Sequence, residues 1–230
     1  MADTPEDPHP GVSRRDWLKT AVSAAVAAPA GALAQGPAGA GATPREPLET
    51  LTPAEADALE AIVARLIPTD EHGPGAREAR AAHYIDRALG GAMAASREVY
   101  RSGLAAVDRY AGTSKGARFA DLSAADQDVV LTDMEKNVAT GFEPNSASFF
   151  TLVRTHTIHG TFGDPHYGGN RDFVGWDLIG YPGLRLAVSE SDQQLNAALA
   201  PTHTSAYDHG MFSPRPPRAG LRLRVIRHGD

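Results

Sequence analysis

The sequence predicts a mostly α-helical protein, with a compact domain of about five helices and a long irregular C-terminal segment wrapped over it. Apolar residues recur at helical spacing in five stretches between residues 52 and 159. No stretch before residue 170 shows the convincing alternation of apolar and polar residues that is typical of a half-buried strand. After residue 170, Gly and Pro are frequent and helix signals are poor. The 230 residues suffice for one ordinary domain.

The first predicted helix has both of its ends marked in the sequence. Thr52 is expected to cap it, Pro53 to take the first helical position and Glu55 to complete a capping box. The apolar residues that follow at helical spacing are Leu59, Ile62, Val63 and Leu66. Pro68 should end the helix, because proline biases the preceding residue away from helical backbone angles.

Four further helices are predicted from the same spacing. They run from about residue 76 to 89, from 96 to 110, from a cap at Ser123 to about 137, and from 146 to 159. The apolar residues expected on them are Tyr84, Ile85, Ala88 and Leu89; Val99, Tyr100, Leu104 and Val107; Val129, Val130 and Met134; and Phe149, Phe150, Leu152, Val153 and Ile158. On the first two of these four helices, the apolar residues are expected to face inward.

The first 34 residues have the layout of a secretory signal. The arginine pair Arg14 and Arg15 precedes an uncharged, Ala-rich run that ends at Ala34 with a small-x-small pattern. Adjacent arginines indicate the twin-arginine type of signal. At about 15 residues the run is shorter than the roughly 20 needed to span a bilayer. We therefore expect export of a folded protein to the periplasm, with a disordered Ala-rich tail as the alternative.

The chain divides into four predicted segments: a signal peptide at 1–34, a flexible Gly/Ala/Pro linker at 35–50, the helical domain at 51–183 and an irregular C-terminal extension at 184–230. Residues 221–226 alternate in a way that would suit a short strand or an extended arm. The C-terminal end of the extension is basic, which favours a solvated tail or an arm that binds an acidic partner or a membrane surface. Its arginines are Arg215, Arg218, Arg222, Arg224 and Arg227.

Composition excludes several function classes. A formal net charge of −6 argues against a general nucleic-acid-binding protein, which needs a basic face. The absence of cysteine excludes disulfides, thiolate zinc sites, iron–sulfur clusters and covalent attachment of c-type haem in this chain. A redox function would therefore require a bound organic cofactor or a partner protein.

Three histidines and an aspartate lie close together in the sequence and could form a metal site. His156 and His159 are three residues apart, so they should share one face of the last predicted helix, and Asp164 and His166 follow. Histidine and carboxylate are suitable ligands for zinc or non-haem iron. The spacing matches no strong metal motif, and structural or hydrogen-bonding histidines are the alternative.

The stretch GDPHYGGNRDFVGW, residues 163–176, combines turn-forming residues with aromatic ones. Asp164-Pro165 and Gly168-Gly169-Asn170 are turn formers, because Pro fixes φ and Gly and Asn accept positive φ. The aromatic residues in and around it are Phe162, Tyr167, Phe173, Trp176 and Tyr181. These side chains could cap the helical core or, together with Asn170, bind a partner. No serine lies in Gly-x-Ser-x-Gly and no catalytic residue is assigned.

These motifs resemble the gluconate 2-dehydrogenase subunit 3 family, the small (gamma) subunits of membrane-bound, FAD-dependent sugar and polyol dehydrogenases. The resemblance covers residues 51–183 and lies behind a twin-arginine leader. The matching stretches are LTPAEADALEAIVARLIPTDEHGPGA at 51–76, HYID at 83–86, RFADLSAADQ at 118–127 and FGDPHYGGNRDFVGWDLIGYPG at 162–183. Nothing is implied for residues 184–230.

The resemblance implies an accessory subunit with no cofactor of its own. In such complexes a large flavoprotein subunit holds FAD and oxidises the sugar, sugar acid or polyol, and a multihaem cytochrome c subunit passes electrons to the inner membrane. The small subunit supports maturation of the large one and carries it through the twin-arginine translocase as a folded pair. The alternatives are a periplasmic metal-binding enzyme that uses His156, His159, Asp164 and His166, and a free periplasmic binding protein for a small ligand.

Overall fold

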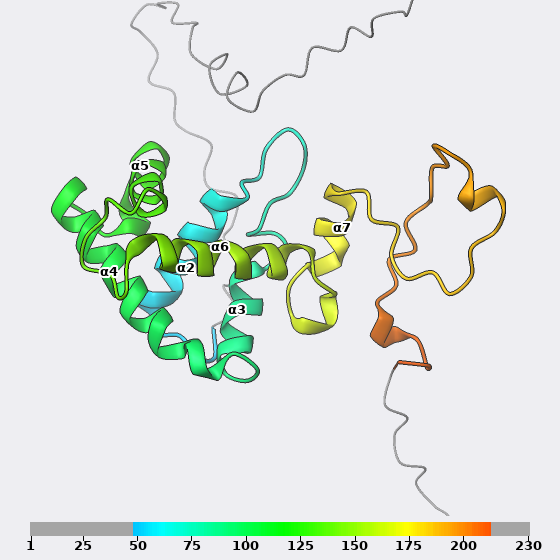
Figure 1. The fold of residues 1–230 in the computed structure, drawn as a ribbon, viewed down its shortest axis with the longest axis horizontal. Helices are drawn as coiled ribbons and strands as arrows, with labels where there is room; N and C mark the ends of the chain where they lie inside the picture. The colour runs from blue at the N-terminus through cyan, green and yellow to red at the C-terminus, as the bar shows by residue number, and fades with distance from the viewer. Residues whose placement is uncertain (1–47, 213–230) are drawn as a thin grey trace, which may run out of the picture. The chain divides into compact units, whose positions relative to one another are not determined.

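A computed structural model of the chain describes residues 48–212. Within that range it contains six α-helices, several short 3₁₀ turns and no strand beyond one isolated bridge between Asp70 and Gly73 (Figure 1). The predicted helical class is therefore confirmed. The arginine pair at 14 and 15, the linker up to residue 47 and the proposed strand at 221–226 lie outside the described residues.

Helix α2 (Pro53–Leu66) begins and ends as predicted. The Thr52 side chain accepts a hydrogen bond from the Glu55 backbone N–H, and the Glu55 carboxylate accepts one from the Thr52 N–H at 2.8 Å, which completes the capping box. Leu59, Ile62 and Val63 are buried. The capping residues and the apolar spacing are local in sequence, so they predict the helix without knowledge of the tertiary fold.

Helix α3 (Ala81–Leu89) begins five residues later than predicted. The chain before it hooks back onto the end of α2, where the Ala76 N–H donates to the Ile67 carbonyl at 2.9 Å. Ala76 and Ala79 are fully buried in this turn. Arg80 then adopts φ 59°, a left-handed conformation that cannot belong to an α-helix. The prediction was wrong here because tertiary contacts override the helix propensity of alanine.

Helix α4 (Arg97–Lys115) extends five residues beyond its predicted end and stops at Gly116, which has φ 84°. Thr113 and Ser114 look like loop residues, but their hydroxyls donate to carbonyls one turn earlier and remain within the helix. The expectation that Val99 faces inward was wrong, since its side chain is 41% exposed. Tyr100, Leu104 and Val107 are buried as predicted.

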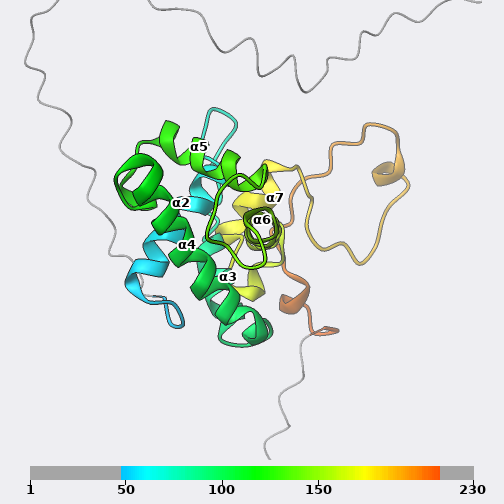
Figure 2. The same ribbon diagram turned by 60° about the vertical axis from the view of Figure 1, so that its left-hand side comes forward.

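Helices α5 (Ala124–Glu135) and α6 (Ser146–Phe162) complete the core. Ser123 caps α5 as predicted, and α6 continues three residues past its predicted end. Close packing holds α6 in place. A Cβ on Gly160 would lie 2.9 Å from the Ala81 Cα in α3, and one on Gly103 of α4 would overlap the Phe149 ring. Figure 2 views α6 almost end-on, with α3 and α7 beside it.

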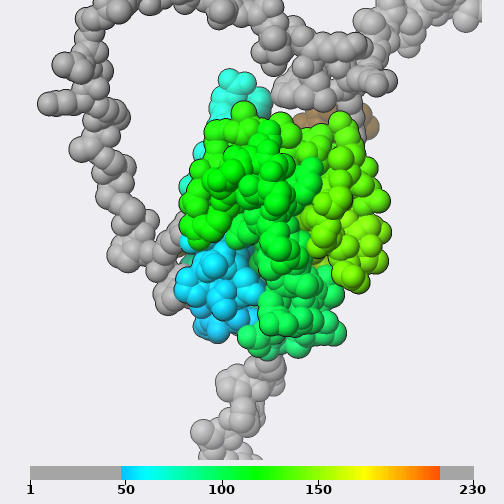
Figure 3. All heavy atoms as spheres, turned by 90° about the vertical axis from the view of Figure 1, so that its left-hand side faces the viewer, coloured from blue at the N-terminus to red at the C-terminus, as the bar shows by residue number. Residues whose placement is uncertain are grey.

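The hydrophobic core lies among α2, α3, α4, α5 and α6. Its largest fully buried side chains are Tyr100, Phe119, Leu59, Ile62, Ile85, Leu89, Leu104 and Met134. Figure 3 shows the surface where α2, in blue, meets α4 and α5, in green. Over residues 48–212, no helix combines the length and apolar character that crossing a membrane requires.

After α6 the described chain contains one short α-helix, α7 (Val174–Leu178), which the sequence did not predict, and otherwise only 3₁₀ turns and irregular segments. Five residues are too few for a periodic apolar pattern to be recognised. Between residues 184 and 212 only two 3₁₀ turns occur, at Ser191–Gln193 and Ala206–Asp208. The irregular character predicted for this segment holds over its described part.

Candidate functional site

Residues 163–181, which we call the signature loop, lie against the C-terminal end of α6. The predicted turn chemistry is present, since Gly168 has φ 96° and Asn170 has φ 42°. Asp172 and Phe173 also adopt positive φ, which the sequence did not indicate. Four left-handed residues within six positions fold this part of the loop into a compact, unusual path.

Two glycines let the backbone of the signature loop touch the backbone of α6. A Cβ on Gly169 would overlap the Gly160 carbonyl oxygen, and a Cβ on Gly175 would overlap the Thr161 carbonyl oxygen. Neither glycine has positive φ, so close approach rather than backbone conformation explains both residues. The loop therefore packs directly on the last turn of α6, with no side chain between them.

Asn170 ties the signature loop together from the inside. Its backbone N–H donates to the Gly160 carbonyl at 2.7 Å, and its Nδ2 donates to the Gly163 carbonyl at 2.8 Å. Its Oδ1 accepts the Gly175 N–H at 2.8 Å. The residue is completely buried. The structure thus places this predicted partner-binding residue in the scaffold, where it cannot contact a partner directly.

Trp176 is also interior, with 6% of its surface exposed. Its Nε1 donates to the Phe162 carbonyl at 3.0 Å, and its ring packs edge-on against Tyr181 at a centroid distance of 4.8 Å. The ring of Phe173 also contacts it, at a centroid distance of 5.2 Å. Burial makes Trp176 a support for its neighbours in this structure. Of the aromatic candidates, Tyr167 and Tyr181 are exposed, and Phe162 and Phe173 are half-buried.

The signature loop binds a later part of the same chain, residues 202–208, which we call the C-terminal clasp. Asp164 accepts hydrogen bonds from the Ser205 hydroxyl at 2.6 Å and from the Ala206 N–H at 3.1 Å. The imidazole of His203 lies 2.7 Å from the Asp177 carboxylate. The sequence analysis assigned no role to this segment. Its one local signal is the S-x-x-D capping pattern that starts at Ser205.

Aromatic rings reinforce the clasp. His203 stacks on Phe173 at 5.1 Å, and Tyr207 stacks on His166 at 3.8 Å. The hydroxyls of Tyr167 and Tyr207 are 2.5 Å apart, and this hydrogen bond, together with burial, raises the pKa of Tyr207. Tyr167 and Phe173 therefore contact the clasp, a segment that the sequence analysis did not connect with them.

The four predicted metal ligands do not converge. His156 lies beside α4, where its Nδ1 is 2.8 Å from the Tyr100 hydroxyl, while Asp164 and His166 are engaged with the clasp. Burial, and secondarily His159, lowers the pKa of His156, so the fold favours its neutral ring. Nowhere in residues 48–212 are three or more His, Asp or Glu side chains placed to hold a metal ion. This geometry does not support the metal-centre hypothesis.

A pocket of about 330 Å³ lies where α6, α7 and the clasp meet. Phe162 and Trp176 line it from within, and Ile179 and Tyr181, both exposed, contribute to its lining. Leu184, Asp164 and Ala206 complete the lining. Sequence reasoning included the aromatic residues but missed Ile179, Leu184 and Ala206. Such a pocket has room for an apolar side chain of another molecule.

The family model for gluconate 2-dehydrogenase subunit 3 matches residues 53–183. The match starts at the first residue of α2 and includes α3 to α7 and the whole signature loop. No curated protein and no solved structure matches the chain. Since the matched residues make up more than half of the 230-residue chain, the protein belongs to the gluconate 2-dehydrogenase subunit 3 family.

Proposed function

We propose that this protein is a noncatalytic subunit that binds, stabilises and co-exports the FAD-containing catalytic subunit of a dehydrogenase of sugars, sugar acids or polyols. The family match over residues 53–183 carries this proposal, because the family is a subunit family of a gluconate dehydrogenase complex. The arginine pair at 14 and 15 supports the export part of the proposal, since such leaders direct proteins to the twin-arginine translocase.

The way the signature loop is built favours a binding role. Gly169, Asn170 and Gly175 serve close packing and internal hydrogen bonding. What they hold in place is a pocket whose exposed residues, Ile179 and Tyr181, are apolar or aromatic. An exposed aromatic side chain such as Tyr181 beside a well-packed pocket is of the type that is enriched in protein-binding hot spots.

Co-export sets a lower limit on how tightly the two subunits must bind. If transport takes on the order of minutes, dissociation must be no faster than about 10⁻² s⁻¹. With an association rate near 10⁶ M⁻¹s⁻¹, the Kd must then be about 10 nM or lower. A few polar rim contacts do not reach this affinity, and an interface of about 800 Å² per partner with buried anchors does.

The remaining assignments follow from the same proposal. The mature complex lies in the periplasm, where the catalytic subunit holds FAD and a multihaem cytochrome c subunit carries the haem. The complex associates with the inner membrane through that cytochrome. This chain contributes no cofactor of its own.

The export role is tested by replacing Arg14 and Arg15 with lysine and following both proteins by cell fractionation. We expect this protein and the catalytic subunit to remain together in the cytoplasm, because the translocase requires the arginine pair. The control Arg45→Lys, outside the pair, should leave export unchanged. A catalytic subunit that still reaches the periplasm when the double variant stays behind contradicts co-export.

A further inference from the structure

We propose that the catalytic subunit docks along the outer face of α6 and inserts an apolar side chain into the pocket at its C-terminal end. This inference rests on the proposed function and specifies the surface that performs it. We define the α6 face as the solvent-exposed side of the helix that ends at the half-buried Phe162. Its exposed members are Ser148, Thr151, Arg154, Thr155, Ile158 and His159.

The α6 face lacks negative charge in an otherwise acidic molecule. Helix α6 contains no Asp or Glu over its 17 residues, and Arg154 is the one permanent charge it carries. In contrast, residues 48–212 contain 22 Asp and Glu against 13 Lys and Arg, a net charge of −9. Depletion of charged residues is the composition that marks the centre of a protein interface.

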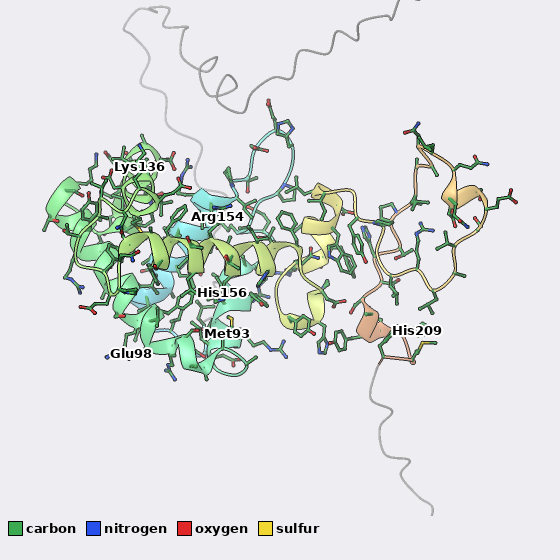
Figure 4. The ribbon with its side chains drawn as sticks, in the orientation of Figure 1. Met93, Glu98, Lys136, Arg154, His156 and His209 are labelled. Carbon is green, nitrogen blue, oxygen red and sulfur yellow. The ribbon has the colours of Figure 1, made fainter. Side chains whose placement is uncertain are left out.

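The inner side of α6 packs against the rest of the domain, and its outer side is exposed to solvent. The inner side is held to α4 by the contact of His156 with Tyr100 and to α3 by Gly160. In Figure 4 Arg154 lies on the opposite side of α6 from His156. Ile158, one turn after Arg154, exposes 41% of its surface although it is aliphatic. The α6 face is therefore rigidly supported and partly apolar, and it is solvent-accessible along its length.

The α6 face leads directly into the pocket. Phe162 belongs to the last turn of α6 and also lines the pocket, next to Trp176. Beyond it, Ile179 exposes 57% of its surface and Tyr181 exposes 44%. The volume of about 330 Å³ suits one large apolar side chain or two small ones from a partner. Helix and pocket thus form one continuous surface with its anchor point at one end.

The area that a stable interface requires indicates that the partner contacts both the α6 face and the surface around the pocket. A 17-residue helix is about 25 Å long and about 10 Å wide, so the α6 face alone offers a footprint of roughly 250 Å². A stable interface needs about 800 Å² on each partner. The binding surface must therefore continue beyond α6, and the exposed apolar residues around the pocket are adjacent to it.

Charge selects the catalytic subunit over a second copy of this chain. A second copy is itself acidic, with a formal net charge of −6 over the full chain, and it therefore repels the first over most of the surface. A partner could present an apolar side chain with a carboxylate beside it. The acidic residues elsewhere on this protein would repel that carboxylate, whereas Arg154 on the α6 face would attract it. We assign such an apolar side chain with a neighbouring carboxylate to the catalytic subunit. Its docking is then restricted to the side of this protein that carries the α6 face.

The test measures how fast the captured complex dissociates. Tagged chain is co-expressed with the catalytic subunit, the complex is captured, and an excess of untagged wild-type chain is added. Three variants on the proposed surface are Ile158→Asp, Arg154→Glu and Ile179→Asp. Each has a matched control elsewhere: Val99→Asp with the same 41% exposure as Ile158, Lys136→Glu, and Val138→Asp with the same 57% exposure as Ile179.

We expect the surface variants to dissociate at least 30-fold faster than wild type, or to yield no complex, while each control stays within about threefold. The Tm of each isolated variant, compared with its control, shows whether the chain is folded. Equal dissociation of variants and controls overturns this inference but leaves the proposed function intact. A wild-type chain that captures no flavoprotein overturns both. An isolated chain that is a dimer, and becomes a monomer on Ile158→Asp, reassigns the surface to self-association and overturns the inference.

Discussion

The Gly175→Ala variant is expected to lose about 3 kcal/mol of unfolding free energy. A Cβ at this position would overlap the backbone carbonyl oxygen of Thr161, and the Asn170 side-chain oxygen would lie 3.0 Å from it. Neither group is a flexible side-chain end that can rotate away. The loop must therefore shift off α6, and overpacking of this kind costs about 1–3 kcal/mol before the hydrogen bonds of Asn170 are also strained. Urea unfolding followed by circular dichroism measures the loss.

The matched control is Gly112→Ala, in the exposed part of α4. No atom lies within 4 Å of a Cβ built there. Alanine is favoured over glycine inside a helix by about 1 kcal/mol, so this variant should be as stable as wild type or slightly more stable. If Gly175→Ala proves as stable as Gly112→Ala, the signature loop does not pack on α6 as described.

The Asp86→Ala variant is expected to lose about 4 kcal/mol. The Asp86 carboxylate is 3% exposed and accepts three backbone N–H groups where the chain enters the domain. These come from Glu49 at 2.7 Å, Thr50 at 3.0 Å and Leu51 at 2.8 Å. Removing the acceptor leaves buried or partly buried donors unsatisfied, at about 1–3 kcal/mol for each fully buried group. The same unfolding experiment measures this loss.

The control for Asp86 is Glu71→Ala, which removes an exposed carboxylate that lies 3.8 Å from the imidazole of its neighbour His72. Exposed pairs of this kind contribute less than about 1 kcal/mol. Glu71→Ala should therefore unfold close to wild type. A similar small loss for Asp86→Ala would mean that the segment before α2 is not anchored through α3.

Features that depend on neighbouring residues could be predicted from the sequence. Thr52 and Glu55 cap α2, and Ser123 caps α5, because each bond joins residues three positions apart. The positive φ at Gly168 and Asn170 follows from the intrinsic preferences of Gly and Asn. These parts of the fold and of the signature loop required no tertiary information.

Features that depend on residues distant in the sequence could not be predicted from the sequence. Arg80 is left-handed because the chain before it hooks onto Ile67, which helix propensity does not reveal. The late end of α4 and the short helix α7 have no periodic signal of sufficient strength. Val99 fits a helical stripe in sequence, yet the core does not extend to it. In each case packing decides between conformations that the local sequence permits.

The same limit applies to the candidate site. An asparagine in a Gly-rich stretch looks like a surface residue, and the burial of Asn170 depends on carbonyl groups that α6 supplies. The clasp depends on pairs such as His203 with Asp177 and Tyr207 with Tyr167, which are 26 and 40 residues apart. The sequence therefore indicated an aromatic, Gly-rich stretch but not which of its residues are buried.

The flavin content of the complex captured through this chain tests the central claim most directly. The tagged protein is co-expressed with the catalytic subunit and captured from the periplasmic fraction, and FAD is released and quantified against the amount of this chain. Our account predicts about one FAD per chain when the catalytic subunit is present and none when this chain is captured alone. Capture without the flavoprotein, or FAD bound to this chain by itself, would contradict the account.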